Sequence, residues 1–496
     1  MIRLAVFAIL VGLASLAQAA APGIEEFEVV VGSQKDVLPP GYHGLQAFPD
    51  QTISIISRSP LRYLLVGIEG TVLMRGSGIK DAVPEKLVLT YGPTGSFDDG
   101  YAGIGSVVRS GDTLVAAYHA ERHVGEIHAP KERACNPKPN YWSIGLAVSN
   151  DEGVTFTKKG QILTSRTPLG QCQRDAYGVG DASFCPHPDG KFLYAYYSYV
   201  TGTPATESNP SGDHDGICVA RCLIRDATEP GGWKKYFEGG FTEPGLGGKE
   251  SLLFERPFQF AGTLQPHVIY IKHMKVFLML CVGISPLEAY SKEPPKQSGI
   301  YWSVSSDGVT WAKPKLLWLG RTVNWDGWEF IGHPTLLLNQ DSEQEARGSV
   351  VYCYTPRFGA GRSDREMHHM VMRPITITRR AKTTPASERP KQNTHGTSWD
   401  QPRSGSISEP TKGGLSDRLR GTKWINTNNV MFEWTNDGRL LHRGNERQWK
   451  PSGDDRVEVV FGKDHVDVIV FDESLKTFKQ LIKGGPSSMN GRRVDQ

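Results

Sequence analysis

Residues 103–121, GIGSVVRSGDTLVAAYHAE, have the pattern of a β-hairpin, with two apolar runs joined by a Ser-Gly-Asp turn. Such a turn between apolar runs is a strong local hairpin signal. After a loop, residues 141–163, YWSIGLAVSNDEGVTFTKKGQIL, add two further strands. Acidic residues stand at both open ends of the hairpin, Asp98 and Asp99 before it and Glu121 at its close. An antiparallel return places these ends side by side, so the carboxylates can share one site.

The same four-strand unit recurs along the chain. Its copies cover residues 52–78, 103–163, 181–239, 266–318 and 333–378, the first and last being the weakest. Repetition of one supersecondary unit is the signature of a repeat architecture. Five units of four strands predict a five-bladed β-propeller, in which radial packing leaves only short protected edges. The early strand EEFEVVV at residues 25–31 is expected to complete the last blade.

Composition divides the chain into parts. Residues 377–418 are rich in Pro, Ser, Thr and Gly without apolar periodicity, which predicts a flexible linker. It follows a propeller at residues 25–376 and precedes residues 419–496, where apolar and polar residues alternate. The C-terminal part resembles the lipocalin-like GxW…F…DG modules. We therefore expect an all-β protein, a five-bladed β-propeller followed by a small C-terminal antiparallel β-domain.

The first residues have the pattern of a targeting signal. MIR is followed by the apolar run LAVFAILVGLASL and then Ala-Gln-Ala, which predicts a cleaved secretory signal at residues 1–19 and a secreted or periplasmic location. No later segment reaches about 18 apolar residues, so no membrane span is expected. A net charge of +3 over 496 residues gives no strong attraction to nucleic acid.

The seven cysteines of an exported chain leave at least one unpaired. Cys135 and Cys172 lie in loop-like stretches and are the pair we predict. The other five fall in apolar strands and are expected to be small buried residues.

Two short segments predict tight turns at the same place in different repeats. Residues 149–156, SNDEGVTF, fit S-x-D-x-G-x-T-[WF], and residues 305–311, SSDGVTW, are one residue shorter. The Asp can cap backbone N–H groups, and the Gly can take a positive φ. Here the chain resembles the Asp-box propellers, which include sialidases and other propeller glycosidases. The motif is structural in that family, so the resemblance implies architecture and no catalytic role.

Topology then gathers polar residues at one face. If the turns just described mark one face, inner-strand starts and second-strand ends share the opposite face. The candidates there are the following: Asp98, Asp99, Asp181, His267 and His333 at inner-strand starts, and His119 and Glu121 at the end of a second strand. This is the usual ligand mouth of a propeller, and we predict His119, His267, His333 and Trp325 as substrate-binding residues.

Glycoside hydrolysis requires a proton donor and a base or nucleophile. Resemblance to the five-bladed glycosidases of the arabinanase and β-xylosidase kind implies an Asp base, a second Asp and a Glu acid, all at inner-strand starts. Asp99 fits the first position and Asp181 the second, although neither is followed by the proline common in that family. Three residues compete for the acid: Glu255, Glu121 and Glu243.

Other readings of the site stay open. A sialidase requires an arginine cluster, for which Arg75, Arg174, Arg256 and Arg357 are available, but it would have six blades and an initial arginine motif that is not recognisable. His119, Glu121 and His123 form H-x-E-x-H along a strand and can in principle bind a metal. We favour a polar lining of the mouth.

Together these features predict a monomeric glycosidase that uses paired carboxylates on a glycan substrate, with no cofactor and no metal. The alternatives are a sialidase-type hydrolase and a propeller that binds carbohydrate or protein without catalysis. The sugar, the linkage and the stereochemical outcome reside in loops whose shapes the sequence leaves open.

Overall fold

The computed structural model of the chain consists of β-strands joined by turns, with four short 3₁₀-helices among the described elements. The helices are η1 (Ile24–Glu26), η2 (Tyr42–Gly44), η3 (Ile224–Asp226) and η4 (Pro230–Gly232). Two compact units divide the chain at Ser387, and each is described by itself. The structure describes residues 23–123, 140–170, 176–202, 214–254, 262–284, 295–322, 329–356 and 367–380, then residue 419 and segments 422–426, 431–435, 439–442, 445–451, 456–462, 465–471, 477–482 and 488–493.

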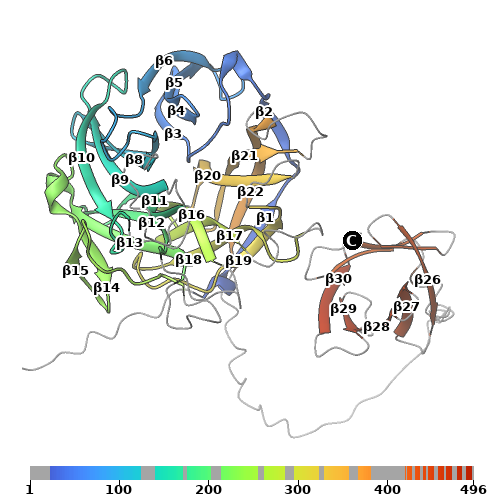
Figure 1. Ribbon diagram of the computed structural model, residues 1–496. Coiled ribbons are helices and arrows are strands. Elements are labelled where there is room, and N and C mark those ends of the chain that lie inside the picture. Colours follow the sequence, from blue (N-terminus) through green and yellow to red (C-terminus); the bar gives the residue numbers. More distant parts are fainter. Residues whose placement is uncertain are drawn as a thin grey trace, which may run out of the picture. The chain divides into compact units, whose positions relative to one another are not determined.

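The first unit contains five antiparallel blades arranged around a centre (Figure 1). Blade 1 consists of β3 (Ser54–Arg58), β4 (Leu61–Gly67), β5 (Gly70–Gly76) and β6 (Val83–Leu89). Blade 2 consists of β7 (Tyr101–Ser110), β8 (Thr113–His123), β9 (Asn140–Ser149) and β10 (Thr157–Thr164). Blade 3 consists of β11 (Ala176–Pro186), β12 (Phe192–Val200), β13 (Gly216–Leu223), β14 (Lys234–Phe237) and β15 (Gly240–Pro244). Blade 4 consists of β16 (Gly262–Ile271), β17 (Val276–Ile284), β18 (Gly299–Ser305) and β19 (Lys315–Leu319).

Blade 5 closes the ring with strands from both ends of the unit. It contains β20 (Phe330–Asp341), β21 (Glu345–Thr355) and β22 (His369–Arg379). The N-terminal β1 (Phe27–Val31) pairs antiparallel with β22, and β2 (Lys35–Leu38) pairs with β22 further along. The predicted five-bladed propeller is confirmed, and so is the completion of its last blade by the early strand. The structure differs from the sequence expectation in blade 3, where β15 adds a fifth strand.

The first strand of each blade lies innermost. β7 contacts β3 and β11, and β16 contacts β11 and β20. A short parallel pairing of Ala176–Gly178 with Asn140–Trp142 also joins the sheets of blades 2 and 3. Because the inner strands converge, side chains near their starts can meet although they are far apart in sequence.

Two of the outer hairpins end in turns that a carboxylate holds together. In blade 2, Asp151 Oδ1 accepts the Thr155 backbone N–H at 2.9 Å, and Gly153 has φ 80°. In blade 4, Asp307 Oδ1 accepts the Thr310 N–H at 2.7 Å, and Gly308 has φ 76°. Each carboxylate thus satisfies turn N–H groups that have no strand partner.

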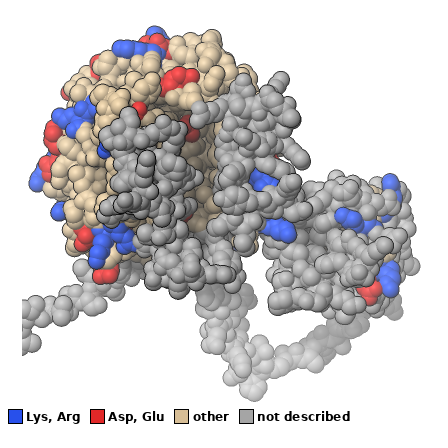
Figure 2. All heavy atoms as spheres, in the orientation of Figure 1, with Lys and Arg blue, Asp and Glu red and all other residues tan. Residues whose placement is uncertain are grey.

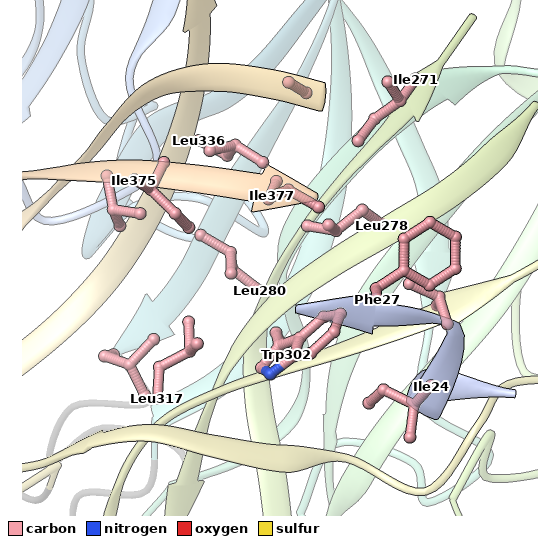
Figure 3. Close-up of a cluster of buried hydrophobic side chains, with 14 of the residues drawn as sticks. Ile24, Phe27, Ile271, Leu278, Leu280, Trp302, Leu317, Leu336, Ile375 and Ile377 are labelled. Carbon is pink, nitrogen blue, oxygen red and sulfur yellow. The ribbon is translucent and has the colours of Figure 1, made fainter. Parts of the chain in front are cut away.

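Apolar side chains fill the space between neighbouring blades. Between blades 4 and 5, Trp302, Leu280 and Leu278 pack with Ile375 and Ile377, all of them buried (Figure 3). Alternating residues of each strand face such a cluster, as expected for sheets packed on both faces.

The second unit contains a closed antiparallel barrel of eight strands. They are β23 (Thr422–Asn426), β24 (Met431–Trp434), β25 (Leu440–His442), β26 (Asn445–Pro451), β27 (Arg456–Gly462), β28 (His465–Phe471), β29 (Thr477–Ile482) and β30 (Ser488–Arg493). β23 pairs with β30 and closes the ring. Trp424 and Trp434 are buried together with Phe471 in its core.

The described cysteines are free and buried on propeller strands: Cys185, Cys218, Cys222, Cys281 and Cys353. This confirms their expected role as small core residues, while Cys135 and Cys172 lie outside the described residues. In the part of the chain that the structure describes, no helix is long and apolar enough to cross a membrane.

Candidate functional site

Hydrogen bonds between neighbouring inner strands identify equivalent positions in the blades. At four junctions, a backbone N–H at the inner strand of one blade donates to a side chain of its neighbour. The pairs are Ile53 N to Thr335 Oγ1 (3.0 Å), Phe184 N to Ser106 Oγ (2.9 Å), Val268 N to Ser183 Oγ (2.9 Å) and Leu336 N to His267 Nδ1 (3.2 Å). The four donors therefore occupy the same place in blades 1, 3, 4 and 5.

The residue three positions before each donor is a polar residue. These residues are Asp50, Asp181, Gln265 and His333. Asp181, Gln265 and His333 have φ values of 50°, 53° and 50°, and the strand register shifts at each of them. A positive φ is rare outside glycine, and strained backbone clusters at functional sites. Its recurrence at three equivalent positions indicates a site where the inner strands converge.

Side chains from different blades meet at these positions. His333 Nε2 lies 3.6 Å from Asp50 Oδ1 and 3.3 Å from Gln265 Nε2. The Gln265 Oε1 atom accepts the His333 backbone N–H at 2.9 Å. Blades 1, 4 and 5 thus place a carboxyl, an amide and an imidazole in one group.

Asp181 is held from three sides. Its Oδ1 accepts a hydrogen bond from Gln51 Nε2 at 3.0 Å, and its Oδ2 accepts one from Ser198 Oγ at 2.8 Å. His119 Nδ1 lies 3.4 Å from Oδ1. With its oxygens engaged and 10% of its side chain exposed, Asp181 is a fixed anion.

The end of β8 adds His119 and Glu121. His119 Nε2 lies 3.4 Å from Glu121 Oε1, so the imidazole stands between the carboxylates of Asp181 and Glu121. Only glycine fits at position 180, because a Cβ there would come within 2.4 Å of the His119 ring. The group is called the central site below. It consists of Asp50, His119, Glu121, Asp181, Gln265 and His333.

Asp50 is the most accessible group of the central site. Its side chain is 44% exposed, against 19% for Glu121 and 8% for His333. Asp50 is nevertheless in contact with other residues. The Tyr101 hydroxyl, for example, donates a hydrogen bond to the Asp50 backbone carbonyl at 3.3 Å. A ligand that enters the central site therefore meets the Asp50 carboxyl first.

The environment separates the protonation states of the acids. Loss of hydration on the buried part of the side chain, together with the charges of Glu121 and Asp181, raises the pKa of Asp50 toward about 7. The Tyr101 hydroxyl and the charge of His119 oppose this, and water at the exposed 44% of the side chain limits the shift. Burial acts to raise the pKa of Glu121, but hydrogen bonds and charges of His119 and His123 prevail and lower it to about 2. Near neutral pH the central site thus contains a carboxyl that can carry a proton beside a carboxylate that cannot.

The two carboxylates act in return on the histidine between them. Burial acts to lower the pKa of His119, but Asp181 and Glu121 raise it to about 10. Burial likewise acts to raise the pKa of Asp181, and His119 holds it well below its usual range. His119 Nδ1 also accepts the Asp181 backbone N–H at 3.2 Å, which holds the ring in place between the two carboxylates.

A cavity of about 300 Å³ lies next to the central site, on the side of His123. It is called the side pocket and is lined by Tyr91, Thr94, Asp99, Gly100 and His123. Glu121 connects the two sites, because its Oε1 faces His119 and its Oε2 lies 2.9 Å from His123 Nε2. Tyr91 is 57% exposed and offers a ring on which an apolar face of a ligand can stack.

Several residues predicted from the sequence lie in the central site, and others do not. Asp181, Glu121, His119 and His333 are in it. Asp99 lines the side pocket, where it accepts the backbone N–H groups of Gly95 and His123. The remaining candidates are placed elsewhere: His267 links blades 4 and 5, Glu243 lies on the outermost strand of blade 3, and Glu255 and Trp325 lie outside the described residues.

Asp50 and Gln265 belong to the central site but were not predicted from the sequence. Asp50 precedes the weakest repeat, and Gln265 stands one residue before the segment that was recognised as a repeat. The signal for both is their spacing of three residues before an apolar inner-strand residue, as in Asp181 and His333.

The sialidase and metal-site alternatives can be compared with the described residues. Of the four arginines considered for a sialidase, Arg75 lies on β5 near Glu85, and Arg174, Arg256 and Arg357 lie outside the described residues. Within the described part of the chain, no group of three or more His, Cys, Asp or Glu side chains is arranged to hold a metal ion.

No family model matches the chain, and no curated protein does. Solved structures similar to it include the endo-arabinase from Bacteroides thetaiotaomicron, with 14% identity, a TM-score of 0.38 and coverage of 68% of this chain and 97% of that one. The endo-1,5-α-L-arabinanase from Thermotoga petrophila has 13% identity and a TM-score of 0.38, covering 93% of this chain and 100% of its own. The α-L-arabinanase from Cellvibrio cellulosa in complex with arabinohexaose has 11% identity and a TM-score of 0.37, covering 68% and 91%. At these scores the central site has to be interpreted from its own geometry.

Proposed function

We propose that this protein is a carbohydrate-active propeller that hydrolyses a glycosidic bond at the central site. The observation that carries the proposal is the convergence of the acids on the central site, Asp50 beside His333 and Glu121 and Asp181 beside His119. The environment raises the pKa of Asp50 toward about 7 and lowers that of Glu121 to about 2. Titratable groups whose environments push their pKa values apart are the pattern of acid and base partners. Glycoside hydrolysis needs such a pair.

The accessibility of the acids supports a division of roles. Asp50, the most exposed of them, acts as the general acid that protonates the leaving oxygen. Glu121 acts as the base that takes a proton from water. Asp181, which contacts Gln51, Ser198 and His119, holds the His119 ring in place and stays charged.

A second candidate is a propeller that binds a glycan without cleaving it. It is favoured by Gln265, which places an amide where the equivalent positions of blades 1 and 3 have carboxylates. Amide groups donate and accept hydrogen bonds with sugar hydroxyls but do not transfer protons.

The described charges on the face drawn in Figure 2 favour neither an anionic nor a cationic ligand. On the face drawn in Figure 2, the described acidic and basic side chains are interspersed rather than gathered by sign. A glycan without charged groups would be recognised by hydrogen bonds and ring stacking, which the central site and the side pocket offer together.

The test is a screen of the full chain against chromogenic aryl glycosides and neutral oligosaccharides, with arabinohexaose among the first because a similar structure binds it. Hydrolysis that Asp50→Asn abolishes supports the enzyme. Binding by calorimetry without product release supports the second candidate. Neither hydrolysis nor binding across the panel would reject both.

The pH dependence of hydrolysis follows from the acid role of Asp50. We expect kcat to fall as pH rises through about 7, where the Asp50 carboxyl loses its proton, with roughly a tenfold loss for each further pH unit. The base remains competent on the acid side until pH approaches about 2, the pKa of Glu121. A profile of kcat between pH 4 and 9 measures this, and a rate that rises through pH 7 would contradict the assignment.

The side pocket would hold the neighbouring sugar of a longer chain. We expect Tyr91→Ala to raise KM for an oligosaccharide about 2- to 10-fold, the loss of a contact worth roughly 0.5–1.5 kcal/mol. Tyr91→Phe keeps the ring and is the matched control. An aryl monoglycoside, too short to reach the pocket, should show unchanged KM in both variants. Equal effects on short and long substrates would remove this subsite.

Export is proposed on the predicted signal at residues 1–19. Mass spectrometry of the mature protein from its native host should find an N-terminus close to residue 20. An intact Met1 would exclude cleavage.

A further inference from the structure

Gln265 contacts His333 in a way that fixes which ring nitrogen of the histidine carries hydrogen. The Gln265 Oε1 atom accepts the His333 backbone N–H at 2.9 Å. A backbone N–H can only donate, so the amide cannot be turned over without two donors facing each other. The NH₂ group of Gln265 must therefore point toward the ring, where Nε2 lies 3.3 Å away.

That NH₂ group needs an acceptor, and Nε2 of His333 accepts only when it bears no hydrogen. The ring hydrogen is then on Nδ1, which has no hydrogen-bond partner among the described residues. Since Nδ1 lacks a partner in either tautomer, the contact at Nε2 decides between them. His333 is also neutral, because burial lowers its pKa to about 4.

The consequence falls on Asp50, whose Oδ1 lies 3.6 Å from the same Nε2. A lone pair there repels an ionised carboxylate and attracts the hydrogen of a protonated one. We propose that Gln265 is a positioning residue that locks His333 in the Nδ1–H tautomer and thereby keeps Asp50 protonated as the proton donor of the central site. The role of Asp50 as a proton donor rests on the proposed function. The tautomer of His333 and the protonation of Asp50 do not depend on it.

The other groups around Asp50 do not replace this effect. It is faced by Glu121 and Asp181, which are anions, by the imidazole of His119 between them, by the hydroxyl of Tyr101 and by the buried thiol of Cys353. The His119 ring contacts two other carboxylates, so His333 is the imidazole whose tautomer adds to the effects of lost hydration, Glu121 and Asp181 on Asp50.

The test uses the full chain without substrate. Long-range ¹H–¹⁵N correlation of histidine-labelled protein should show His333 as the Nδ1–H tautomer, and the Asp50 carboxyl carbon, assigned with Asp50→Asn, should titrate near pH 7. In Gln265→Met the amide is lost at similar volume, and the ring is free to donate from Nε2 to Asp50. The pKa of Asp50 should then fall by at least about one unit, the size expected when a hydrogen bond favours the charged form.

Gln51→Met is the matched control, since it removes a glutamine that donates to Asp181 and leaves His333 untouched. Asp181 stays ionised near neutral pH, so the pKa of Asp50 should not change. An Nδ1–H tautomer with a downward shift confined to Gln265→Met supports the proposal. An Nε2–H tautomer in the unaltered protein overturns it, even if the variants do not fold, and so does an Asp50 pKa that is equal in both variants. Because no substrate is used, these outcomes are independent of whether a glycan is hydrolysed.

Discussion

Replacing Asp50 by asparagine should reduce kcat by roughly 10²- to 10⁴-fold, the contribution that a positioned proton donor makes to catalysis. Asparagine has the shape of the carboxyl and, like its protonated form, no charge. It cannot transfer a proton to a leaving oxygen. Because the pKa of Asp50 is raised to about 7, the protein already tolerates a neutral group here, and we expect the variant to fold normally. The measurements are kcat on the best substrate of the panel and the urea unfolding curve of the same preparation.

Asp99→Asn is the matched control for this change. Asp99 is also an acid near the mouth, but it lines the side pocket and bonds backbone N–H groups of Gly95 and His123. Its replacement should change KM for long substrates and leave kcat within a few-fold. If Asp99→Asn abolishes turnover while Asp50→Asn retains it, the catalytic acid is in the side pocket and the assignment made here is wrong.

Asp50 and Asp99 also show how much of the fold and of the site can be predicted from the sequence. The blades follow from local alternation and turn signals, which are properties of neighbouring residues, and hence the five-bladed ring could be predicted. Asp181, His119 and Glu121 could be grouped because inner-strand starts and second-strand ends share a face. Asp99 was also predicted at an inner-strand start. It precedes β7, however, and lines the side pocket instead of the central site.

Asp50 and Gln265 could not be predicted from the sequence because their roles depend on long-range packing. The partner of Asp50 is His333, on the opposite end of the unit, and closure of the ring brings them within 3.6 Å. Gln265 carries no charge and belongs to no motif, so nothing in its surroundings distinguishes it. The hydrogen bonds between inner strands are what show that it occupies the same position as Asp50 and Asp181.

The largest effect on stability should come from a buried ion pair in blade 3. Lys235 on β14 and Glu250 both have fully buried side chains and form an ion pair. The Lys235 ammonium also donates to the carbonyls of Thr164 at 2.6 Å and Gly248 at 2.9 Å. Three acceptors match its three hydrogens. This arrangement ties β14 to the end of β10 and to the segment after β15.

Lys235→Met keeps most of the apolar volume and removes the charge, so Glu250 is left buried without its partner. Breaking a buried pair in this way costs about 3–5 kcal/mol of unfolding free energy, which urea denaturation measures. Lys234→Met is the matched control, because Lys234 is adjacent, exposed and expected to change stability by less than about 0.5 kcal/mol. Burial raises the pKa of Glu250, and without Lys235 this effect is opposed by Arg166 but no longer by a direct ion pair. The loss of unfolding free energy should therefore shrink as pH falls toward the ordinary pKa of a glutamate, where Glu250 is protonated in both the folded and the unfolded protein.

The double variant Lys235→Met/Glu250→Gln should recover part of this loss at pH 8. Equal losses in the single and double variants would show that the charge of the pair is not what stabilises this edge of the blade.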